Sequence, residues 1–313
     1  MTKPKTLQTP WYDEAIKAFQ LAGMSESTQQ TYARAVRKLI EFYNKEPQKI
    51  TEDELKKYFL HLRNEANWAP STMKICFCAL KFFFINVLQR KWPLFEYLKA
   101  QKENRLPSVL SPDEVRKILS RVRTFHNYTF LVTVYTCGLR LKEALYLQVS
   151  DIDGKRMMIH IHRGKGSKDR YVPLPEETYH LLRRYWLVHR NPVLIFPALG
   201  RSGKSASTSE TPMSIDSVQG AFRAAREQAG IIKRHVSIHT LRHSYATYLL
   251  EQGVNIRVIQ RYLGHARLET TMVYLHLTQK GQEDAYQIIN QSMRGFENGR
   301  HSKHLSRACA GIS

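Results

Sequence analysis

The sequence is poor in the features that build disulfide frameworks, membrane spans and secretory signals. Its 313 residues contain four cysteines, at positions 76, 78, 137 and 309, too few and too irregularly spaced for a disulfide framework or a four-ligand zinc site. The nearest approach to a membrane span, residues 75–88, is interrupted by Lys81 and Asn86 and favours a core helix. The first ten residues lack the apolar stretch of a secretory signal. We therefore expect a cytoplasmic protein without a membrane partner.

Acidic residues are scarce relative to basic ones. The chain has 48 Lys and Arg against 27 Asp and Glu, a formal net charge of +21. Because every phosphate neutralised by Lys or Arg releases condensed counterions, a charge of this size predicts nucleic acid as the partner, with a merely soluble basic protein as the alternative. No carboxylate cluster suggests the paired metal ligands of a two-metal nuclease or transposase. We therefore expect no metal and no other cofactor.

Helical periodicity dominates the first third of the chain. Ser27 and Gln30 have the spacing of a capping box, and apolar residues follow at helical spacing as far as Tyr43. Further helices are predicted over 11–21, 51–65 and 70–90, which together suggest a small bundle. The polar stretch 99–110 contains Pro107 and predicts a linker. The expected organisation is a helical domain (1–98), the linker (99–110), a second domain (111–296) and a basic, disordered tail (297–313).

The second domain is predicted to be mostly helical with one small hairpin. Ser111, Pro112 and Glu114 have the spacing of a helix start, and Gly138 follows a predicted helix as its stop. Two short strands flank a basic, glycine-containing tip at 163–169. The Gly/Ser/Thr-rich loop 200–212 is expected to be flexible. The expected helices are 112–121, 125–137, one from Arg140, 176–189, 214–229, 239–252, 255–262, 268–275 and 282–294, and the expected strands are 157–162 and 170–173.

Two pairs of residues in this domain have the spacing of a phosphate-binding site. His239 and Arg242 lie at i and i+3 and share one helical face, followed by His243. Arg140 precedes Glu143 by three residues, so the carboxylate can orient the guanidinium. Taken alone, the first pair is more often a solvated basic face and the second more often an ordinary helical ion pair.

Three further residues are ambiguous on their own. Lys165 lies between two glycines at the hairpin tip, where a flexible lysine can reach a substrate oxygen, although such lysines are usually surface residues. His265 precedes Tyr274 by nine residues. With sixteen tyrosines in the chain, Tyr274 by itself is best explained as a core residue.

Taken in order, these residues resemble the tyrosine recombinase (phage integrase) family, including its Xer-like and integron-integrase-like members. The resemblance rests on GLRLKEAL (138–145), RGKGSKDRYVPL (163–174), HTLRHSYATYLLEQG (239–253) and IQRYLGHARLETTMVYLHL (259–277). Residues 25–43 are also similar to the first long helix of the family's core-binding domain. The loop 200–212 is longer than in compact members, and the tail 300–313 has no counterpart there.

The resemblance implies a fold and a set of roles. The fold is mainly α with a small β-hairpin or sheet, built from an N-terminal SAM-like core-binding bundle and a C-terminal catalytic domain. The expected catalytic residues are Arg140, Lys165, His239, Arg242, His265 and Tyr274, with Glu143 in support. Arg140 and Arg242 would clamp the phosphate, Lys165 would protonate the departing 5′-oxygen, and His265 would bind the phosphate. His239 would accept the proton of Tyr274, and the surrounding positive charge would favour its phenolate.

The predicted function is site-specific DNA recombination through a 3′-phosphotyrosyl intermediate, without metal or ATP, in integration or excision of a mobile element or a related process. The resemblance implies a homotetramer on two DNA duplexes, and we expect it in the cytoplasm, at the bacterial nucleoid when bound to DNA. Arg34, Arg37 and Lys38 are candidate phosphate contacts. Two alternatives stay open: relaxation of DNA in the manner of a type IB topoisomerase, and a DNA-binding protein that has lost catalysis.

Overall fold

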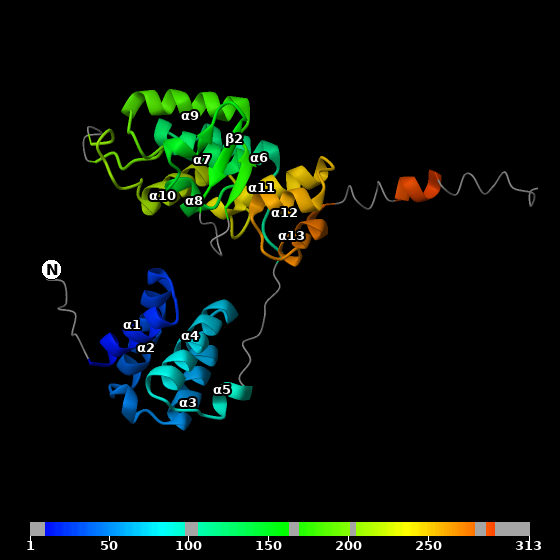
Figure 1. Ribbon diagram of the computed structural model, residues 1–313. Coiled ribbons are helices and arrows are strands. Elements are labelled where there is room, and N and C mark those ends of the chain that lie inside the picture. The colour runs from blue at the N-terminus through cyan, green and yellow to red at the C-terminus, as the bar shows by residue number, and fades with distance from the viewer. Residues whose placement is uncertain (1–9, 98–105, 163–168, 201–204, 279–285, 292–313) are drawn as a thin grey trace, which may run out of the picture. The chain divides into compact units, whose positions relative to one another are not determined.

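The computed structural model describes residues 10–97, 106–162, 169–200, 205–278 and 286–291 (Figure 1). The chain divides into two compact units, Met1–Arg105 and Leu106–Ser313. This division falls inside the segment 99–110 that composition marks as a linker, and the predicted tail 297–313 lies outside the described residues. Most of the described residues are helical, and the strands form one small sheet, which confirms the predicted fold class.

The first unit is a helical bundle with an aromatic core. Its helices pack around buried Phe19, Leu39, Phe83 and Phe84, each 0 % exposed. The helices predicted over 11–21, 51–65 and 70–90 are confirmed, the last of them ending in a π-helical turn. The elements are α1 (Pro10–Leu21), α2 (Glu26–Tyr43), a 3₁₀ turn (Pro47–Lys49), α3 (Glu52–Asn64), α4 (Pro70–Phe82), the π-helical turn (Phe83–Val87) and α5 (Leu94–Tyr97), which was not predicted.

The start of α2 differs from the sequence prediction. Ser25 is the N-cap residue, with extended φ and ψ, and Ser27 lies inside the helix, where its carbonyl accepts a hydrogen bond from the Thr31 hydroxyl. The Ser27–Gln30 capping box is therefore wrong, because an equally polar serine two residues earlier takes the cap. A capping box does form at Thr51 and Glu54, at the start of α3.

One helical stretch, Pro70–Val87, is long and apolar enough by length and composition to be a candidate membrane span. In the structure this stretch packs against α2, and Cys76, Leu80 and Phe83 contribute to the core of the first unit. Soluble proteins with a buried core helix pass the same test, so the packing agrees with the interpretation of residues 75–88 as a core helix.

The second unit packs its helices around a three-stranded antiparallel sheet of order β1-β2-β3. Its core includes buried Phe130, Ile159, Val172 and Phe196. The elements are α6 (Pro112–Ser120), α7 (Phe125–Thr136), α8 (Leu141–Leu145), a 3₁₀ turn (Val149–Asp151), β1 (Ile152–Asp153), β2 (Met158–Ile161), β3 (Arg170–Pro173), α9 (Glu176–His189), α10 (Ile215–Gln228), α11 (Ile238–Glu251), α12 (Ile256–Leu263), α13 (Glu269–Met272) and a 3₁₀ segment (Val273–Leu277).

These elements agree with the prediction for the second unit apart from two short ones, the 3₁₀ turn Val149–Asp151 and strand β1. Strand β1 was not predicted, because two residues are too short for a period of two to be visible. Of the predicted helix 282–294, residues 286–291 are described and helical. The hairpin is confirmed by the pairing of Ile159 with Val172 and of Ile161 with Arg170, while its tip 163–168 lies outside the described residues.

Part of the loop 200–212 is held in place. The side-chain amide of Asn191, a residue 1 % exposed, donates hydrogen bonds to the carbonyls of Ala206 (2.8 Å) and Ser209 (2.9 Å). Composition predicted a flexible loop. The described residues 205–212 instead include a buried anchor at Ala206, supplied by an asparagine that local sequence does not connect to the loop.

Candidate active site

The structure brings together five of the six predicted catalytic residues at one place in the second unit. Arg140 is the N-cap residue of α8, Arg242 and His239 lie on α11, His265 follows α12, and Tyr274 lies in the 3₁₀ segment after α13. Helix α11 packs against α7, α12 and the 3₁₀ segment, so residues more than a hundred positions apart become neighbours. The sixth residue, Lys165, lies outside the described residues.

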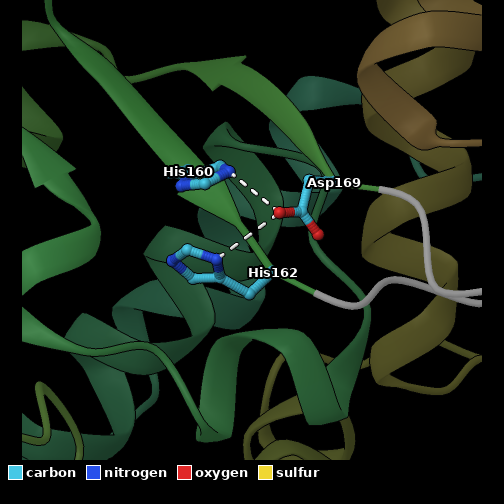
Figure 2. A group of neighbouring side chains, drawn as sticks. All are labelled: His160, His162 and Asp169. Atoms are coloured by element: carbon cyan, nitrogen blue, oxygen red, sulfur yellow. Dashed lines mark ion pairs between the residues drawn. The ribbon is translucent and has the colours of Figure 1, made fainter.

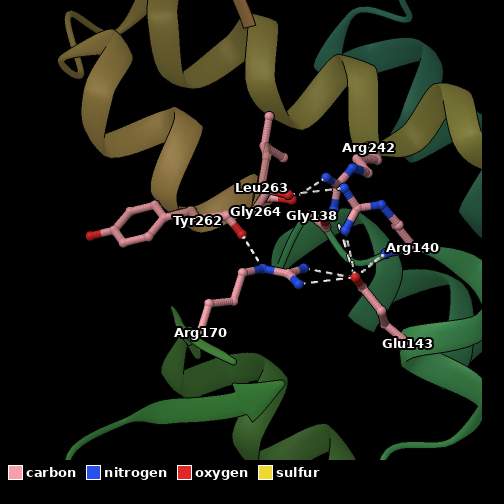
Figure 3. A network of polar contacts seen from close by, with 8 residues as sticks. All are labelled: Gly138, Arg140, Glu143, Arg170, Arg242, Tyr262, Leu263 and Gly264. Carbon is pink, nitrogen blue, oxygen red and sulfur yellow. Dashed lines mark hydrogen bonds and ion pairs between the residues drawn. The ribbon is translucent and has the colours of Figure 1, made fainter. Parts of the chain in front are cut away.

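Glu143 lies at the centre of a network of arginines (Figure 3). Its carboxylate accepts hydrogen bonds from Arg140 Nη1 (2.7 Å) and the Arg140 backbone N–H (2.8 Å). It also accepts two from Arg170, Nη1 at 2.9 Å and Nη2 at 2.7 Å, in the paired geometry that makes Arg–carboxylate contacts strong. Glu143 therefore orients two guanidinium groups at once, a larger role than the Arg140 contact predicted from the sequence.

Arg242 belongs to the same network and is fixed mainly by two backbone carbonyls. Its side chain is 1 % exposed, Nη1 donates to the Gly138 carbonyl at 2.7 Å, and Nη2 contacts the Leu263 carbonyl. Nη1 also lies 3.8 Å from Glu143. Gly138 adopts a φ of +60°, and a Cβ there would lie 2.4 Å from the ring of Tyr245, so a larger residue would displace this carbonyl.

The network leaves a surplus of positive charge. Burial raises the pKa of Glu143, but hydrogen bonds and charges from Arg170 and Arg140 outweigh burial and lower the pKa to about 2. Burial and the charge of Arg140 lower the pKa of Arg242 to about 9, which leaves the guanidinium charged at neutral pH. Three cationic groups thus surround one carboxylate, an arrangement suited to an anion with several oxygen atoms.

Arg170 was not singled out as a site residue from the sequence. It is the first residue of β3, its side chain is 6 % exposed, and its Nε donates to the Tyr262 carbonyl at 2.8 Å. Arg170 lies 27 positions from Glu143 and 92 from Tyr262, so no local spacing reveals the contacts. The one feature of the sequence that pointed to Arg170 as a site residue was its position at the end of a basic segment, and a surface arginine has the same feature.

Tyr274 is buried, and its hydroxyl meets a histidine that was not among the predicted catalytic residues. The residue is 2 % exposed, and its hydroxyl lies 2.9 Å from His243 Nδ1. The sequence prediction gave His239 as the partner. Among the described residues the hydrogen bond of Tyr274 is instead to His243, whose ring lies edge-on to that of His239 at 4.7 Å. The signal for His243 was its place four residues after His239 on the same helix.

Protonation in the resting site differs from the expectation for Tyr274. Burial raises the pKa of Tyr274, and the charges of Arg242 and Arg140 lower it by less, so the phenol keeps its proton. Burial, with the charges of His239 and Arg242, lowers the pKa of His243 to about 4. A neutral His243 beside a protonated phenol is set to accept the hydroxyl proton at Nδ1.

His265 is oriented by a buried threonine. Its Nδ1 lies 3.0 Å from the hydroxyl of Thr271, a residue 0 % exposed, and its ring lies nearly parallel to that of Tyr274 at 6.4 Å. Burial, together with the charges of Arg242, Arg140, His243 and Arg170, lowers the pKa of His265 to about 3. A neutral imidazole in this place can donate one hydrogen bond to an anion without adding a charge.

Acid should destabilise the protein through these histidines. The ordinary pKa is 6.5, and that of folded His243 is about 4, so between these values the unfolded chain binds a proton that the folded chain does not. Stability is therefore lost as pH falls from 6.5 towards 4, by on the order of 1–2 kcal/mol at pH 5 from this group. Calorimetry of the full chain at pH 7 and pH 5 measures the loss. His243→Gln should lose less than wild type, exposed His180→Gln should match wild type, and equal losses in all three would contradict the assignment.

The predicted DNA-binding residues lie in the other unit, on the exposed face of α2. Arg34, Arg37 and Lys38 are all exposed. The Arg37 guanidinium carbon lies 5.9 Å from the ring centre of Tyr12, and Lys38 Nζ lies 4.9 Å from that of Trp68. Aromatic packing steadies two of the three side chains while their charges stay accessible to a phosphate backbone.

Two parts of the chain match known protein families. Residues 108–280 match the phage integrase family, and residues 11–94 match the N-terminal SAM-like domain of phage integrases. A putative integrase/recombinase, y4qK, of Sinorhizobium fredii is 36 % identical over 87 % of this chain and 85 % of its own length. Tyrosine recombinase XerA of Pyrococcus horikoshii is 28 % identical over 87 % of this chain and 91 % of its own.

A solved structure shares the fold. The XerH site-specific recombinase bound to a palindromic difH substrate, in a post-cleavage complex, superposes with a TM-score of 0.66 at 22 % identity, over 89 % of this chain and 85 % of that one. The family match covers more than half of the chain, including Arg140, Arg242 and Tyr274. The chain therefore belongs to the phage integrase family and is a tyrosine recombinase.

Proposed function

We propose that this recombinase cleaves and rejoins DNA through Tyr274. As a member of its family it is a site-specific DNA recombinase. The observation that supports the assignment of the residues is the position of Tyr274: a buried phenol, hydrogen-bonded to a neutral histidine, whose pKa is under the influence of Arg140 and Arg242. Among the described residues this arrangement combines a nucleophile, a proton acceptor and a cationic phosphate site.

The reaction exchanges one phosphoester for another. The Tyr274 oxygen attacks the phosphorus, a Tyr–O–P bond forms, and the bond from phosphorus to the 5′-oxygen breaks. Arg140 and Arg242 stabilise the charge that develops on the non-bridging oxygens, and His265 donates a further hydrogen bond. Lys165 supplies the proton for the departing 5′-oxygen. Because no water enters, the energy of the broken bond is kept in the 3′-phosphotyrosyl link, and a second 5′-hydroxyl can reverse the step without ATP.

The burial of Tyr274 adds a requirement. With 2 % of the residue exposed, its oxygen must become accessible to the phosphate before it can attack. His243 Nδ1 is within hydrogen-bond distance of the Tyr274 hydroxyl, so it is the group best placed to accept the hydroxyl proton as the oxygen attacks the phosphorus. We assign the role of proton acceptor to His243. The ring of His239 packs edge-on against that of His243, and we assign to it the role of holding His243 in place.

Replacing His243 tests the assignment of the proton acceptor. His243→Gln should lower the rate of covalent adduct formation about 10²-fold, at the lower end of general-base effects, without weakening DNA binding. The rate of the variant should rise with pH as hydroxide replaces the lost base. His239→Gln is the matched control and should cost less. If His239→Gln lowered the rate of adduct formation more than His243→Gln does, His239 would be the proton acceptor.

The proposed activity is tested by trapping the covalent intermediate. DNA fragments that the protein binds are recovered and sequenced, and a duplex with a nick next to the bound site is incubated with the protein without metal. Loss of the short nicked strand prevents religation, so we expect an adduct that withstands denaturant. Products joining two DNA molecules distinguish recombination from mere relaxation, and binding without an adduct would indicate a protein that has lost catalysis.

The assembly we propose is a homotetramer on two DNA duplexes. Residues 286–291 form a helical turn after the site, on which Tyr286, Ile288 and Ile289 are 67 %, 65 % and 58 % exposed. Apolar side chains at this exposure favour an interaction surface, and a neighbouring subunit of the tetramer is the partner we assign to it. We further propose that the protein acts in the bacterial cytoplasm on a mobile element, which its likeness to integrases supports.

A further inference from the structure

Two histidines and an aspartate meet on one face of the β2–β3 hairpin, away from Tyr274 in the sequence (Figure 2). His160 lies on β2 and His162 is the first residue after it, and their ring centres lie 3.9 Å apart. The antiparallel register pairs Ile161 with Arg170, which places Asp169 opposite His162. The three side chains thus come from both arms of the hairpin, and one ligand atom from each lies within 4.8 Å of the others.

The distances from Asp169 to the two histidines are close to the distance between two ligands of one metal ion. Asp169 Oδ2 lies 3.5 Å from His160 Nε2 and 3.7 Å from His162 Nδ1. Ligands at about 2.1 Å from a tetrahedral Zn²⁺ are separated from one another by about 3.4 Å. Direct hydrogen bonds between nitrogen and oxygen are shorter, with a usual length of about 2.9 Å. Both separations from Asp169 are therefore too long for a direct hydrogen bond and close to the separation of two ligands on one ion, and the two histidine atoms lie within 4.8 Å of each other.

A fourth residue favours the ligating form of His162. Asp151 is 5 % exposed, and among the described residues its Oδ1 has no hydrogen-bond partner other than the one that His162 can supply. This oxygen lies 2.8 Å from His162 Nε2. A carboxylate at this distance attracts the ring proton to Nε2, which leaves the lone pair on Nδ1, the atom that faces Asp169. The same carboxylate–histidine–metal arrangement orients histidine ligands in metal sites generally.

The remaining contacts hold the first histidine and provide access. The His160 ring stacks on that of Tyr171, with centres 4.5 Å apart and planes 8° apart, so its orientation is restricted. An open cavity of about 460 Å³ is lined by His160, His162 and Asp151 and gives an ion a route from solvent. Two imidazoles and one carboxylate suit Zn²⁺ and similar divalent transition metals better than Mg²⁺ or Ca²⁺.

We propose that His160, His162 and Asp169 bind a divalent transition-metal ion of the zinc class, with water as the fourth ligand. Asp151 orients His162 and is a positioning residue. The ion joins the end of β2 to the start of β3, the two positions in the sequence between which Lys165 lies. Its role is structural, and the transfer of the phosphoester to Tyr274 takes place without it.

Metal binding to the tag-free full chain tests the proposal directly. Calorimetric titration with Zn²⁺ should find one site that His160→Ala and Asp169→Asn remove, while exposed His180→Ala keeps it. Asp151→Asn should weaken binding about 10- to 100-fold without removing it, the usual effect of changing a residue that orients a ligand. Co²⁺ in place of zinc should give the visible absorption of a four-coordinate site, absent from His160→Ala.

The outcomes separate the site from adventitious binding and from the proposed recombinase activity. A zinc-dependent rise in melting temperature in wild type and Asp151→Asn, but not in Asp169→Asn, supports a clamp between the strands. Unchanged zinc binding in His160→Ala and Asp169→Asn, with circular dichroism showing both variants folded, would overturn the proposal. Adduct formation by His160→Ala in chelator should equal that of wild type, so loss of the metal site leaves the test of Tyr274 unaffected.

Discussion

Tyr274→Phe is expected to bind its DNA as wild type does and to form no covalent adduct at all. The substitution removes one oxygen atom from a ring that stays buried, so the packing of the 3₁₀ segment is kept and only the contact with His243 is lost. No phosphotyrosyl bond can form without that oxygen, and the expected effect is complete. Recovery of the protein–DNA adduct from a nicked duplex under denaturing conditions is the measurement.

The same variant also identifies the DNA for the experiment. Because it binds without cleaving, Tyr274→Phe can capture and enrich fragments that wild type would cut, and these supply the nicked duplex. Tyr97→Phe, at an exposed position of the first unit, is the matched control and should form the adduct normally. An adduct formed by Tyr274→Phe on DNA cleaved by wild type would place the nucleophile at another residue.

Local sequence predicted the helices and the hairpin well, because each carries its own signals. The capping box at Ser111 and Glu114 and the stop at Gly138 are such signals, and both occur in the structure. Ser27 shows where such local signals fail, because Ser25 and Ser27 are both of a residue type that caps helices, and the helix begins directly after Ser25.

The site was predicted from a family resemblance and only in part from the residues themselves. Spacing found Arg140 with Glu143, three residues apart, since a single helical turn joins them. It missed Arg170, whose contacts with Glu143 depend on the folded sheet. The resemblance assigned the tyrosine proton to His239, but His243 lies one helical turn further along, only about 40° away around the helix axis, so only the packed structure decides which of the two meets Tyr274.

The balance between burial and charge at Tyr274 could not be predicted from the sequence. Basic residues nearby suggested a lowered pKa, but the size of the opposing effect depends on how completely the phenol is buried. With 2 % of Tyr274 exposed, burial has the larger effect and the pKa is raised. The resting enzyme therefore needs both a base and the approach of a phosphate to activate its nucleophile.

Arg242→Lys is expected to lower the rate of adduct formation by about 10²–10³-fold or more, although the charge is kept. Arg242 donates to the Gly138 carbonyl with Nη1 while Nη2 contacts the Leu263 carbonyl, and the planar fork of the guanidinium is what allows both contacts from one rigid group. A lysine has one ammonium on a flexible chain, so it cannot satisfy both carbonyls and also meet a phosphate oxygen.

The loss must be separated from simple unfolding, since Arg242 is 1 % exposed and its removal leaves buried carbonyls without a donor. The full chain is therefore compared at a temperature where circular dichroism shows wild type and Arg242→Lys equally folded, and binding to the DNA captured with Tyr274→Phe is measured in parallel. Arg257→Lys, on the exposed side of α12, is the control for exchanging the two cations. A folded Arg242→Lys that binds DNA and cleaves within a few-fold of wild type would mean that charge alone suffices, and the requirement for a guanidinium fixed by the two carbonyls would have to be abandoned.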